Sequence, residues 1–347
     1  MTWEKTFTTD IGLDARLFDR VQLSMDYYNK NTSGLLYQVP VPGVTGVTRV
    51  WRNIGEVRNR GFEATLSVDV IKNKDFIWTI DGNIGLNRNK VTRLYGLRDK
   101  ETGEVPPQII SSGINIAGSG SRILREGYDA DTWYMPEWAG VNPENGAPQW
   151  YKTVTDANGV KTREKTSVYS EADQVQLGAY NPKFHGGFAS SLVWKQFDAN
   201  MVFGYSVGGK IFNYSRMEYD SDGTYTDRNQ MRLMPDWSRW EKPGDIATHP
   251  VARYENQSLS NRVSSRFLED GTYLRMRNLT LGYNLRLPQY HLSNVRLYIS
   301  GENLFTLTGY SGVDPEIPPS DNAVVGSVGP GVYPSVRKFL VGIDITF

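Results

Sequence analysis

The sequence contains no cysteine among its 347 residues. Disulfides, thiolate nucleophiles and metal sites with cysteine ligands are therefore excluded, whatever compartment the protein occupies. An excess of charge of one sign is also missing, since 38 lysine and arginine residues balance 38 aspartate and glutamate residues. Neither a strongly acidic nor a strongly basic partner is expected, and the dispersed basic residues argue against nucleic-acid binding.

Long apolar runs are absent as well. No stretch of about 18 apolar residues occurs, so the sequence predicts no transmembrane helix. The first ten residues, MTWEKTFTTD, lack the basic, apolar and small-residue regions of a secretory signal peptide. We therefore expect either a cytoplasmic protein or a chain that begins inside a longer one.

Aromatic residues and period-two alternation are abundant. Aromatics make up 12% of the chain although hydrophobic residues reach only 39%. In nine segments apolar residues occupy every second position, which is typical of strands with one apolar and one polar face. These segments are residues 7–17, 21–28, 61–70, 78–87, 188–194, 197–208, 279–285, 295–302 and 338–347. No domain boundary interrupts the pattern, so residues 1–347 are expected to form one all-β unit.

The links between these segments alternate between short and long. Loops longer than about 15 residues are uncommon in compact soluble domains, whereas outer-membrane barrels combine short periplasmic turns with long extracellular loops. Several segments also reach the roughly 10 residues of a tilted membrane-crossing strand. The short links are residues 18–20, 71–75, 195–196 and 288–294, and the long ones are residues 31–57, 95–183, 211–271 and 306–335.

The sequence therefore predicts about nine strands of an antiparallel transmembrane β-barrel with long extracellular loops. The first link is short and would lie in the periplasm, so the first strand would begin at the outer rim. Because the links then alternate, the ninth strand would end in the periplasm. The alternative is a soluble or surface all-β glycan-binding protein, because alternation alone does not distinguish a barrel from a sandwich.

Several motifs resemble the C-terminal half of the SusC/RagA family of TonB-dependent outer-membrane transporters. The DGTYLRMRNLTLGY and LYISGENLFTLTGYSGVDPE segments are the most similar to the family pattern. The motifs lie at residues 3–14, 21–33, 53–63, 177–188, 270–283 and 297–316, with Tyr333-Pro334 and the closing Phe347.

The resemblance implies a barrel of about 22 strands that is plugged by an N-terminal domain. It also implies location in the cell outer membrane, contact with outer-membrane lipid, a SusD-like lipoprotein partner, and import of oligosaccharides or peptides. TonB would act only through an N-terminal part, and this chain has neither that part nor the plug. We therefore expect residues 1–347 to be the C-terminal part of the barrel, a fragment that does not transport alone.

Aromatic residues in the long loops are the candidate substrate-binding residues. Sugar rings pack their C–H faces on aromatic planes, so tryptophan-rich outer loops suit glycan capture. The alternative is that these rings pack the loops into a compact cap or against the partner lipoprotein. The candidates are Trp133, Tyr134, Trp138, Trp150, Tyr151, Trp237 and Trp240.

The sequence shows no recognisable pattern of catalytic residues. His185, His249 and His291 are scattered, with no visible metal-ligand spacing or pairing with an acid, so we expect no enzyme. Carboxylates on the polar strand faces are expected to form a polar lumen wall rather than acid–base pairs. These carboxylates are Asp10, Asp14, Glu63, Asp69, Asp81 and Asp198.

Cofactor sites are not expected either. Residues 218–223 resemble the start of an EF-hand calcium loop, with Asp220 and Asp222 as candidate ligands. A polar turn is the favoured interpretation, because Asn229 occupies the position where the bidentate glutamate belongs. Gly118 and Gly120 lack the strand-then-helix context of a phosphate-binding loop.

Overall fold

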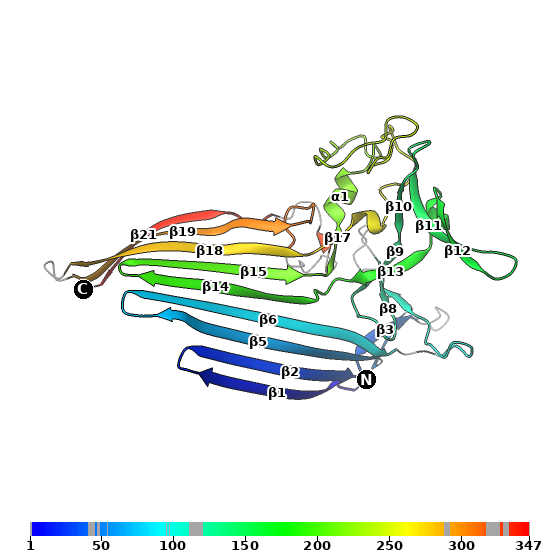
Figure 1. The fold of residues 1–347 in the computed structure, drawn as a ribbon. Helices are drawn as coiled ribbons and strands as arrows, with labels where there is room; N and C mark the ends of the chain where they lie inside the picture. The colour runs from blue at the N-terminus through cyan, green and yellow to red at the C-terminus, as the bar shows by residue number, and fades with distance from the viewer. Residues whose placement is uncertain are drawn as a thin grey trace.

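The computed structural model describes residues 2–40, 46, 49–53, 55–94, 96, 98–110, 121–287, 292–316, 327–328 and 333–346. Its main body is a nine-stranded antiparallel sheet in which spatial order follows sequence order (Figure 1). The strands are β1 (Lys5–Leu17), β2 (Val21–Ser33), β5 (Glu56–Lys72), β6 (Phe76–Arg93), β14 (Phe184–Trp194), β15 (Phe197–Val207), β18 (Tyr273–Leu287), β19 (Leu292–Thr308) and β21 (Lys338–Thr346).

These strands confirm the nine predicted segments. Most continue further toward the long-loop end than the alternation indicated; β6, for example, reaches Arg93. Two of the short links are tight turns in which Phe18, Asp19 and Lys195 adopt positive φ angles of 54°, 52° and 54°. In another turn the Asn73 side chain accepts the backbone N–H of Phe76 at 2.8 Å. Residues 288–291 of the fourth link lie outside the described residues.

The register aligns the apolar residues of neighbouring strands on one face. Ile11 is opposite Tyr27, Tyr27 is opposite Phe62, and Phe62 is opposite Leu86. This face is not covered by another layer, since Phe7 and Ile11 keep relative exposures of 70% and 67%. In a soluble sandwich such a face would be buried against a second sheet.

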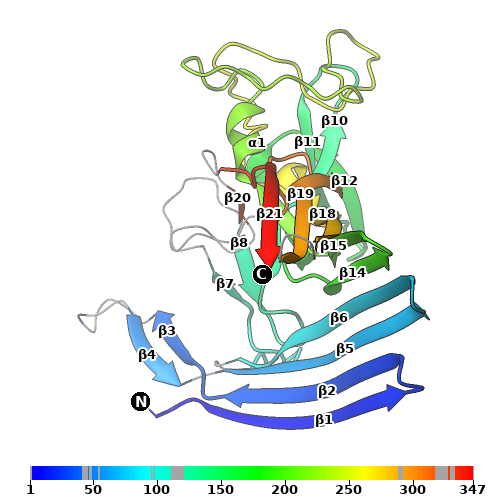
Figure 2. The ribbon, with the colours of Figure 1, turned by 90° about the vertical axis from the view of Figure 1, so that its left-hand side faces the viewer.

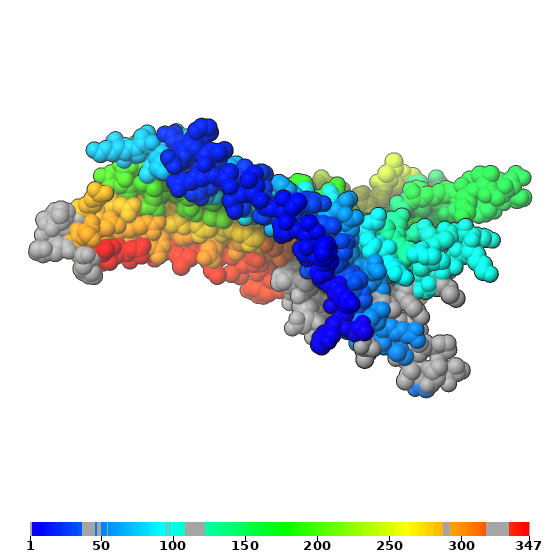
Figure 3. Space-filling model, turned by 90° about the horizontal axis from the view of Figure 1, so that it is seen from below, coloured from blue at the N-terminus to red at the C-terminus, as the bar shows by residue number. Residues whose placement is uncertain are grey.

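The opposite face is polar and hydrogen-bonded across strands. The Tyr28 hydroxyl donates to Asn87 Oδ1 at 3.2 Å, and the amides of Asn87 and Asn89 both donate to Asn59 Oδ1, at 3.3 and 2.8 Å. Figure 3 shows the first strand in dark blue and the last in red along opposite sides of the curved sheet. Within the described residues β1 and β21 each have only one neighbouring strand in this sheet.

The long loops gather at one end of the sheet, at the opposite end from the C-terminus (Figures 1 and 2). They contain regular structure that the alternation of apolar residues does not predict. The additional elements are β3 (Leu36–Pro40), β4 (Arg49–Asn53), β7 (Gln108–Ile110), β8 (Ser121–Leu124), β9 (Thr132–Pro136), β10 (Trp138–Val141), β11 (Pro148–Thr155), β12 (Lys161–Thr166), β13 (Gln174–Ala179), β16 (Lys210–Asn213), β17 (Leu268–Asp270), β20 (Ser327–Val328), α1 (Tyr214–Tyr219), and the 3-10 turns η2 (Tyr169–Glu171) and η3 (Ser265–Phe267).

We call residues 98–110, 121–183 and 208–272 together the loop cap. Most of the buried large apolar side chains of the described residues lie in it, whereas the middles of the main strands contribute none. As for helices, none in the described part of the chain is long and apolar enough to span a membrane.

Candidate functional site: the loop cap and the polar face

The loop cap has a hydrophobic core of its own. Trp133 on β9, Phe212 on β16 and Phe267 on η3 are fully buried, with Met135 and Met217 packed beside them. The rings of Trp133 and Phe212 lie 6.1 Å apart, and the Trp133 indole N–H donates to a β16 backbone carbonyl at 2.9 Å. Segments far apart in the sequence are therefore joined by buried aromatic area, which stabilises the cap.

A second aromatic cluster holds the sheet formed by β10, β11 and β12. Trp150 is fully buried and contacts the rings of Trp138 and Tyr169 edge-on, at 5.7 and 5.2 Å. Trp240 is also buried, and its indole N–H donates to the Pro143 carbonyl at 2.8 Å. Both tryptophans thus act as packing residues between cap segments.

The structure separates the candidate substrate-binding aromatics into two groups. Trp133, Trp150 and Trp240 are buried, so they present no ring face to a ligand in this structure. Their burial fits the alternative interpretation, in which the rings pack the long loops into a compact cap, because a long loop needs apolar area of its own to stay folded. The partly exposed group consists of Tyr134, Trp138, Tyr151 and Trp237.

Guanidinium groups cover part of the partly exposed rings. The Arg163 guanidinium carbon lies 3.6 Å from the Tyr151 ring centre, and that of Arg216 lies 4.3 Å from the Trp237 ring centre. Arg266 lies 5.2 Å from the Trp138 ring. The Arg163 side chain is exposed, whereas those of Arg216 and Arg266 are largely buried, so these two contacts hold the rings in place within the cap.

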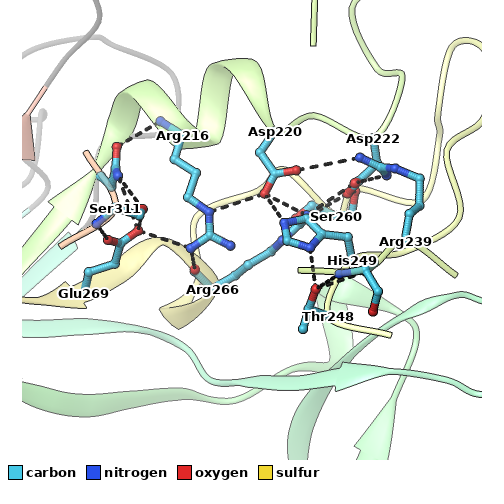
Figure 4. A network of polar contacts seen from close by, with 12 residues as sticks. Arg216, Asp220, Asp222, Arg239, Thr248, His249, Ser260, Arg266, Glu269 and Ser311 are labelled. Carbon is cyan, nitrogen blue, oxygen red and sulfur yellow. Dashed lines mark hydrogen bonds and ion pairs between the residues drawn. The ribbon is translucent and has the colours of Figure 1, made fainter. Parts of the chain in front are cut away.

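A network of buried charges lies next to the cap core (Figure 4). Asp222 is fully buried and accepts hydrogen bonds from Arg266 and Arg239, both at 2.6 Å. Ser260 donates to the same carboxylate at 2.7 Å. Two guanidinium groups therefore compensate one buried carboxylate, which offsets its loss of hydration.

Asp220 occupies a similar position two residues earlier. It accepts from Arg266 at 3.2 Å and from Arg216 at 3.3 Å, and His249 Nε2 lies 2.9 Å from its Oδ2. Burial alone would raise the pKa of Asp220, but the Arg266 charge, His249 and Arg216 outweigh it and hold the pKa below its ordinary value. Burial likewise opposes the charge on Arg266, yet Asp222 and Asp220 raise the pKa of its guanidinium.

The network continues toward the main sheet. Arg216 also donates to Glu269 on β17 at 3.1 Å, and Glu269 accepts from both the backbone N–H and the hydroxyl of Ser311, each at 2.6 Å (Figure 4). Glu269 thereby connects α1, β17 and the segment that follows β19.

This arrangement lends no support to calcium at Asp220 and Asp222. Their oxygens already contact arginine side chains, whose positive charges would repel a cation. Across the described ranges there is also no group of three or more histidine, aspartate or glutamate side chains suited to a metal ion. The polar-turn interpretation fits the observed contacts better.

The histidines show one pairing that sequence spacing missed. His249 and Asp220 form an acid–histidine contact, and Thr248 Oγ1 lies 2.8 Å from His249 Nδ1. The Thr248 hydroxyl also donates to the Ser238 carbonyl at 3.0 Å, and His249 is fully buried. Because Asp220 and His249 are both buried, the contact contributes to packing within the loop cap. His185 lies exposed on β14, and His291, like Gly118 and Gly120, lies outside the described residues.

A second charged cluster lies at the loop end of β18. Arg275 pairs with Asp314 and, at 3.0 Å, with Glu316, which also binds Arg277; Arg275 and Asp314 are both buried. Burial raises the pKa of Asp314, but the hydrogen bond from Arg275 and a backbone N–H reverse the effect and lower it. The spacing of the two arginines on one strand was the only signal for this cluster in the sequence.

A pocket of about 180 Å³ opens beside this cluster, between the loop cap and the sheet. It has room for one small group and is smaller than the roughly 300 Å³ of a typical ligand site. Its lining includes Tyr180, Pro182, Ser206, Ile211, Tyr273 and Glu316.

The predicted carboxylates lie on the polar face of the sheet. Asp198 binds Arg296 at 2.6 Å and Asn284 at 2.7 Å, and Asp69 binds Lys72 at 2.7 Å and Thr79 at 2.9 Å. Asp10, Asp14, Glu63 and Asp81 lie on this polar face as well, because each stands between apolar-face residues along its strand. The contacts of Asp198 and Asp69 are those of a hydrogen-bonded polar wall.

Comparison with known proteins agrees with this architecture. The family model described as TonB dependent receptor-like, beta-barrel matches residues 1–181. TonB-dependent receptor P3 of Formosa agariphila is 34% identical over 361 residues, which cover 100% of this chain and 34% of that protein. TonB-dependent receptor SusC of Bacteroides thetaiotaomicron is 27% identical, with 100% of this chain and 32% of SusC covered.

Among solved structures, that of the RagAB peptide transporter superposes with a TM-score of 0.79 at 26% identity, covering 100% of this chain and 36% of that chain. The RagAB peptide importer in the 'closed-closed' state gives a TM-score of 0.76 at 25% identity, covering 100% and 36%. The chain thus spans about a third of the length of the relatives it matches.

These matches confirm the resemblance to SusC and RagA that the motifs indicated, and the family consists of transporters and receptors rather than enzymes. Because the family model covers more than half of the chain and the nine-stranded sheet has the same fold, this chain belongs to the TonB-dependent receptor-like β-barrel family.

Proposed function

We propose that this chain forms part of the wall and the outer loop cap of a TonB-dependent importer in the outer membrane. The observation that carries the proposal is the uncovered apolar face of the nine-stranded sheet, opposite a hydrogen-bonded polar face. Lipid would cover the first face and the substrate path would lie along the second. The loop cap, gathered at one end, would face outward.

The substrate class we propose is an oligosaccharide or a peptide. Asn59, Asn87 and Asn89 offer amide donors and acceptors that suit the hydroxyl or amide groups of either polymer. The similar RagAB structure is that of a peptide transporter. In the loop cap, Tyr134, Trp138, Tyr151 and Trp237 remain the candidate contacts for substrate.

The partner we propose is a SusD-like lipoprotein that docks on the loop cap. A buried aromatic core and an ion-pair network support this proposal, because they would hold the cap surface in a defined shape. Energy would come from TonB through polypeptide outside these 347 residues. The chain would supply walls and docking surface, with no bond chemistry.

Fractionation and uptake test the proposal together. In the native host the protein should appear in the outer membrane and require detergent for extraction. Deleting the gene for the complete importer that contains this chain should abolish uptake of one oligosaccharide or peptide class, and a plasmid with that complete gene should restore it. A monodisperse protein in the detergent-free soluble fraction would instead favour the glycan-binding alternative.

Variants of the partly exposed rings test the substrate contact. Tyr134→Ala with Trp138→Ala should lower uptake at limiting substrate by roughly 5- to 150-fold, because each of the two aromatic contacts contributes roughly 0.5–1.5 kcal/mol and 1.4 kcal/mol corresponds to a factor of about ten. Tyr254→Ala is the matched control, since Tyr254 is an exposed loop aromatic outside the candidate group. Equal uptake by both variants would contradict the assignment.

A further inference from the structure

A block of four cations interrupts the apolar face of the sheet at its loop end. Arg58 and Arg60 lie on β5, and Arg88 and Lys90 lie on the neighbouring β6. The register places Arg58 opposite Lys90 and Arg60 opposite Arg88. We call these residues the basic block.

The basic block faces the same side as the apolar residues. Arg60 and Phe62 are two positions apart on β5, as are Arg88 and Leu86 on β6, and side chains two positions apart share a face. The pairing of β5 has no register shift between Val57 and Asp69, so the alternation is unbroken.

A hydrogen bond supports this orientation. Arg58 Nε donates to Asn29 Oδ1 at 2.8 Å, and Asn29 on β2 follows the apolar-face residue Tyr27 by two positions. That bond also orients the Arg58 guanidinium along the sheet surface.

The arrangement is electrostatically unfavourable by itself. Like charges directly opposite each other in a sheet repel and lower stability. None of the four cations forms an ion pair within 4.0 Å with a carboxylate of the described residues. Arg60, Arg88 and Lys90 are exposed to solvent. The block therefore presents uncompensated positive charge that an external anion would neutralise.

The rows next to the block indicate what kind of anion fits. Ile11, Tyr27, Phe62 and Leu86 form the adjacent row, and the next row is Leu13, Met25, Ala64 and Ile84. A ligand bound at the basic block would thus extend over an apolar surface. Its chemistry should combine a multiply charged headgroup with hydrocarbon chains.

We propose that the basic block binds the phosphorylated headgroup of an outer-leaflet lipid, whose acyl chains lie along these apolar rows. The inference rests on the proposed location in the outer membrane. Arginine side chains bind phosphate through paired charge-assisted hydrogen bonds, and basic clusters at a membrane surface recruit anionic headgroups. The bound lipid would relieve the repulsion between facing cations and fix this part of the wall in the membrane.

The test compares lipid binding by matched variants of the protein purified from outer membranes. Arg60→Gln with Arg88→Gln removes one cation from each strand of the block. Arg16→Gln with Lys30→Gln is the control, because these exposed cations lie on the polar face. The probe is lipid A with phosphorylated glucosamine units in mixed micelles, alongside lipid A stripped of its phosphates.

The block variant should bind phosphorylated lipid A roughly 30-fold more weakly than wild type, given the usual contribution of a cation at an anionic membrane surface. The control variant should bind like wild type, and Arg60→Lys with Arg88→Lys should retain most binding. Equal insertion and heat-modifiable mobility of all variants would show that folding is intact.

Three results would overturn the inference. Wild-type binding that does not depend on the lipid phosphates would exclude headgroup recognition, and equal loss in the control variant would show a nonspecific charge effect. Inhibition by inorganic phosphate alone, with no contribution from the acyl chains, would indicate a free-anion site. Fractionation separates these results from failure of the proposed function, because a protein absent from the outer membrane would contradict both proposals.

Discussion

Arg266 is the residue on which the buried charges of the loop cap depend. Its guanidinium contacts both Asp220 and Asp222, and all three side chains are buried. A buried ion pair gains little net free energy over apolar packing, but removing one partner leaves an uncompensated charge in a poorly solvated site.

Arg266→Met should therefore destabilise the loop cap by about 3–5 kcal/mol. Arg125→Met is the matched control, because Arg125 pairs with Glu104 at an exposed site, where such pairs contribute roughly 0–1 kcal/mol. Denaturant unfolding of the cap, followed by tryptophan fluorescence in the membrane-extracted protein, measures both changes. Similar small losses in the two variants would show that the buried network is not a main support of the cap.

The lowered pKa of Asp220 makes cap stability depend on pH. Its folded-state pKa lies below the unfolded value of about 3.9, so its stabilising contribution is fully present above that value and is lost as pH falls toward the folded pKa.

Asp220→Asn should consequently reduce the free energy of unfolding most at neutral pH. The difference from wild type should shrink as pH falls below about 4. Unfolding of both proteins across this range measures the difference. A gap that widens on acidification would contradict the proposed role of the ionised carboxylate.

At the scale of the element, successive side chains of each main strand point alternately to the apolar face and to the polar face of the sheet. On β5, Leu66 lies on the apolar face and pairs with Leu23, whereas the adjacent Thr65 lies on the polar face and pairs with Asn83. Both side chains are exposed in the isolated chain, so only a membrane would distinguish them.

Leu66→Arg should lower barrel stability by about 2–4 kcal/mol, because a charge near the bilayer midplane loses its hydration. Thr65→Arg should have little effect, since its side chain would face the aqueous path. The amount of heat-modifiable protein in outer membranes reports both outcomes. Equal tolerance of the two substitutions would contradict the assignment of the lipid face.

The loop-cap elements form by a different rule. On β12, Lys161–Thr166 has the sequence KTREKT, with no apolar alternation, and it is a strand because it pairs with β11 beside the buried Trp150. Such elements follow from tertiary packing and could not be predicted from pattern or propensity.

At the scale of the whole molecule, the two edge strands of the sheet determine whether the chain stays monomeric. Within the part of the chain that the structure describes, β1 and β21 each pair with one strand of this sheet, so each leaves a row of backbone groups without a strand partner. Unpaired backbone is costly in hydrocarbon, and exposed edges promote association in water.

The 347-residue chain expressed by itself should therefore aggregate when it is refolded in detergent. Size-exclusion chromatography and heat-modifiable electrophoretic mobility measure this outcome. A complete relative such as TonB-dependent receptor P3 is the positive control and should give a monodisperse barrel. A cooperative, heat-modifiable monomer of the chain alone would contradict the prediction.

The alternation of apolar and polar residues was sufficient to predict the nine strands, their antiparallel order and the end at which the loops gather. Strand geometry repeats every two residues, so a local pattern records which face each side chain occupies. Motifs such as LYISGENLFTLTGYSGVDPE were sufficient for the family.

The loop cap depended on contacts between distant segments instead. Nothing in the spacing of Asp220 and His249, or of Arg275 and Asp314, indicates that these residues meet. Burial of Trp133 and exposure of Arg60 likewise depend on which segments pack around them, because solvent exposure is a property of the assembled chain. Alternation is read along one strand, whereas burial and charge compensation arise only when strands and loops come together.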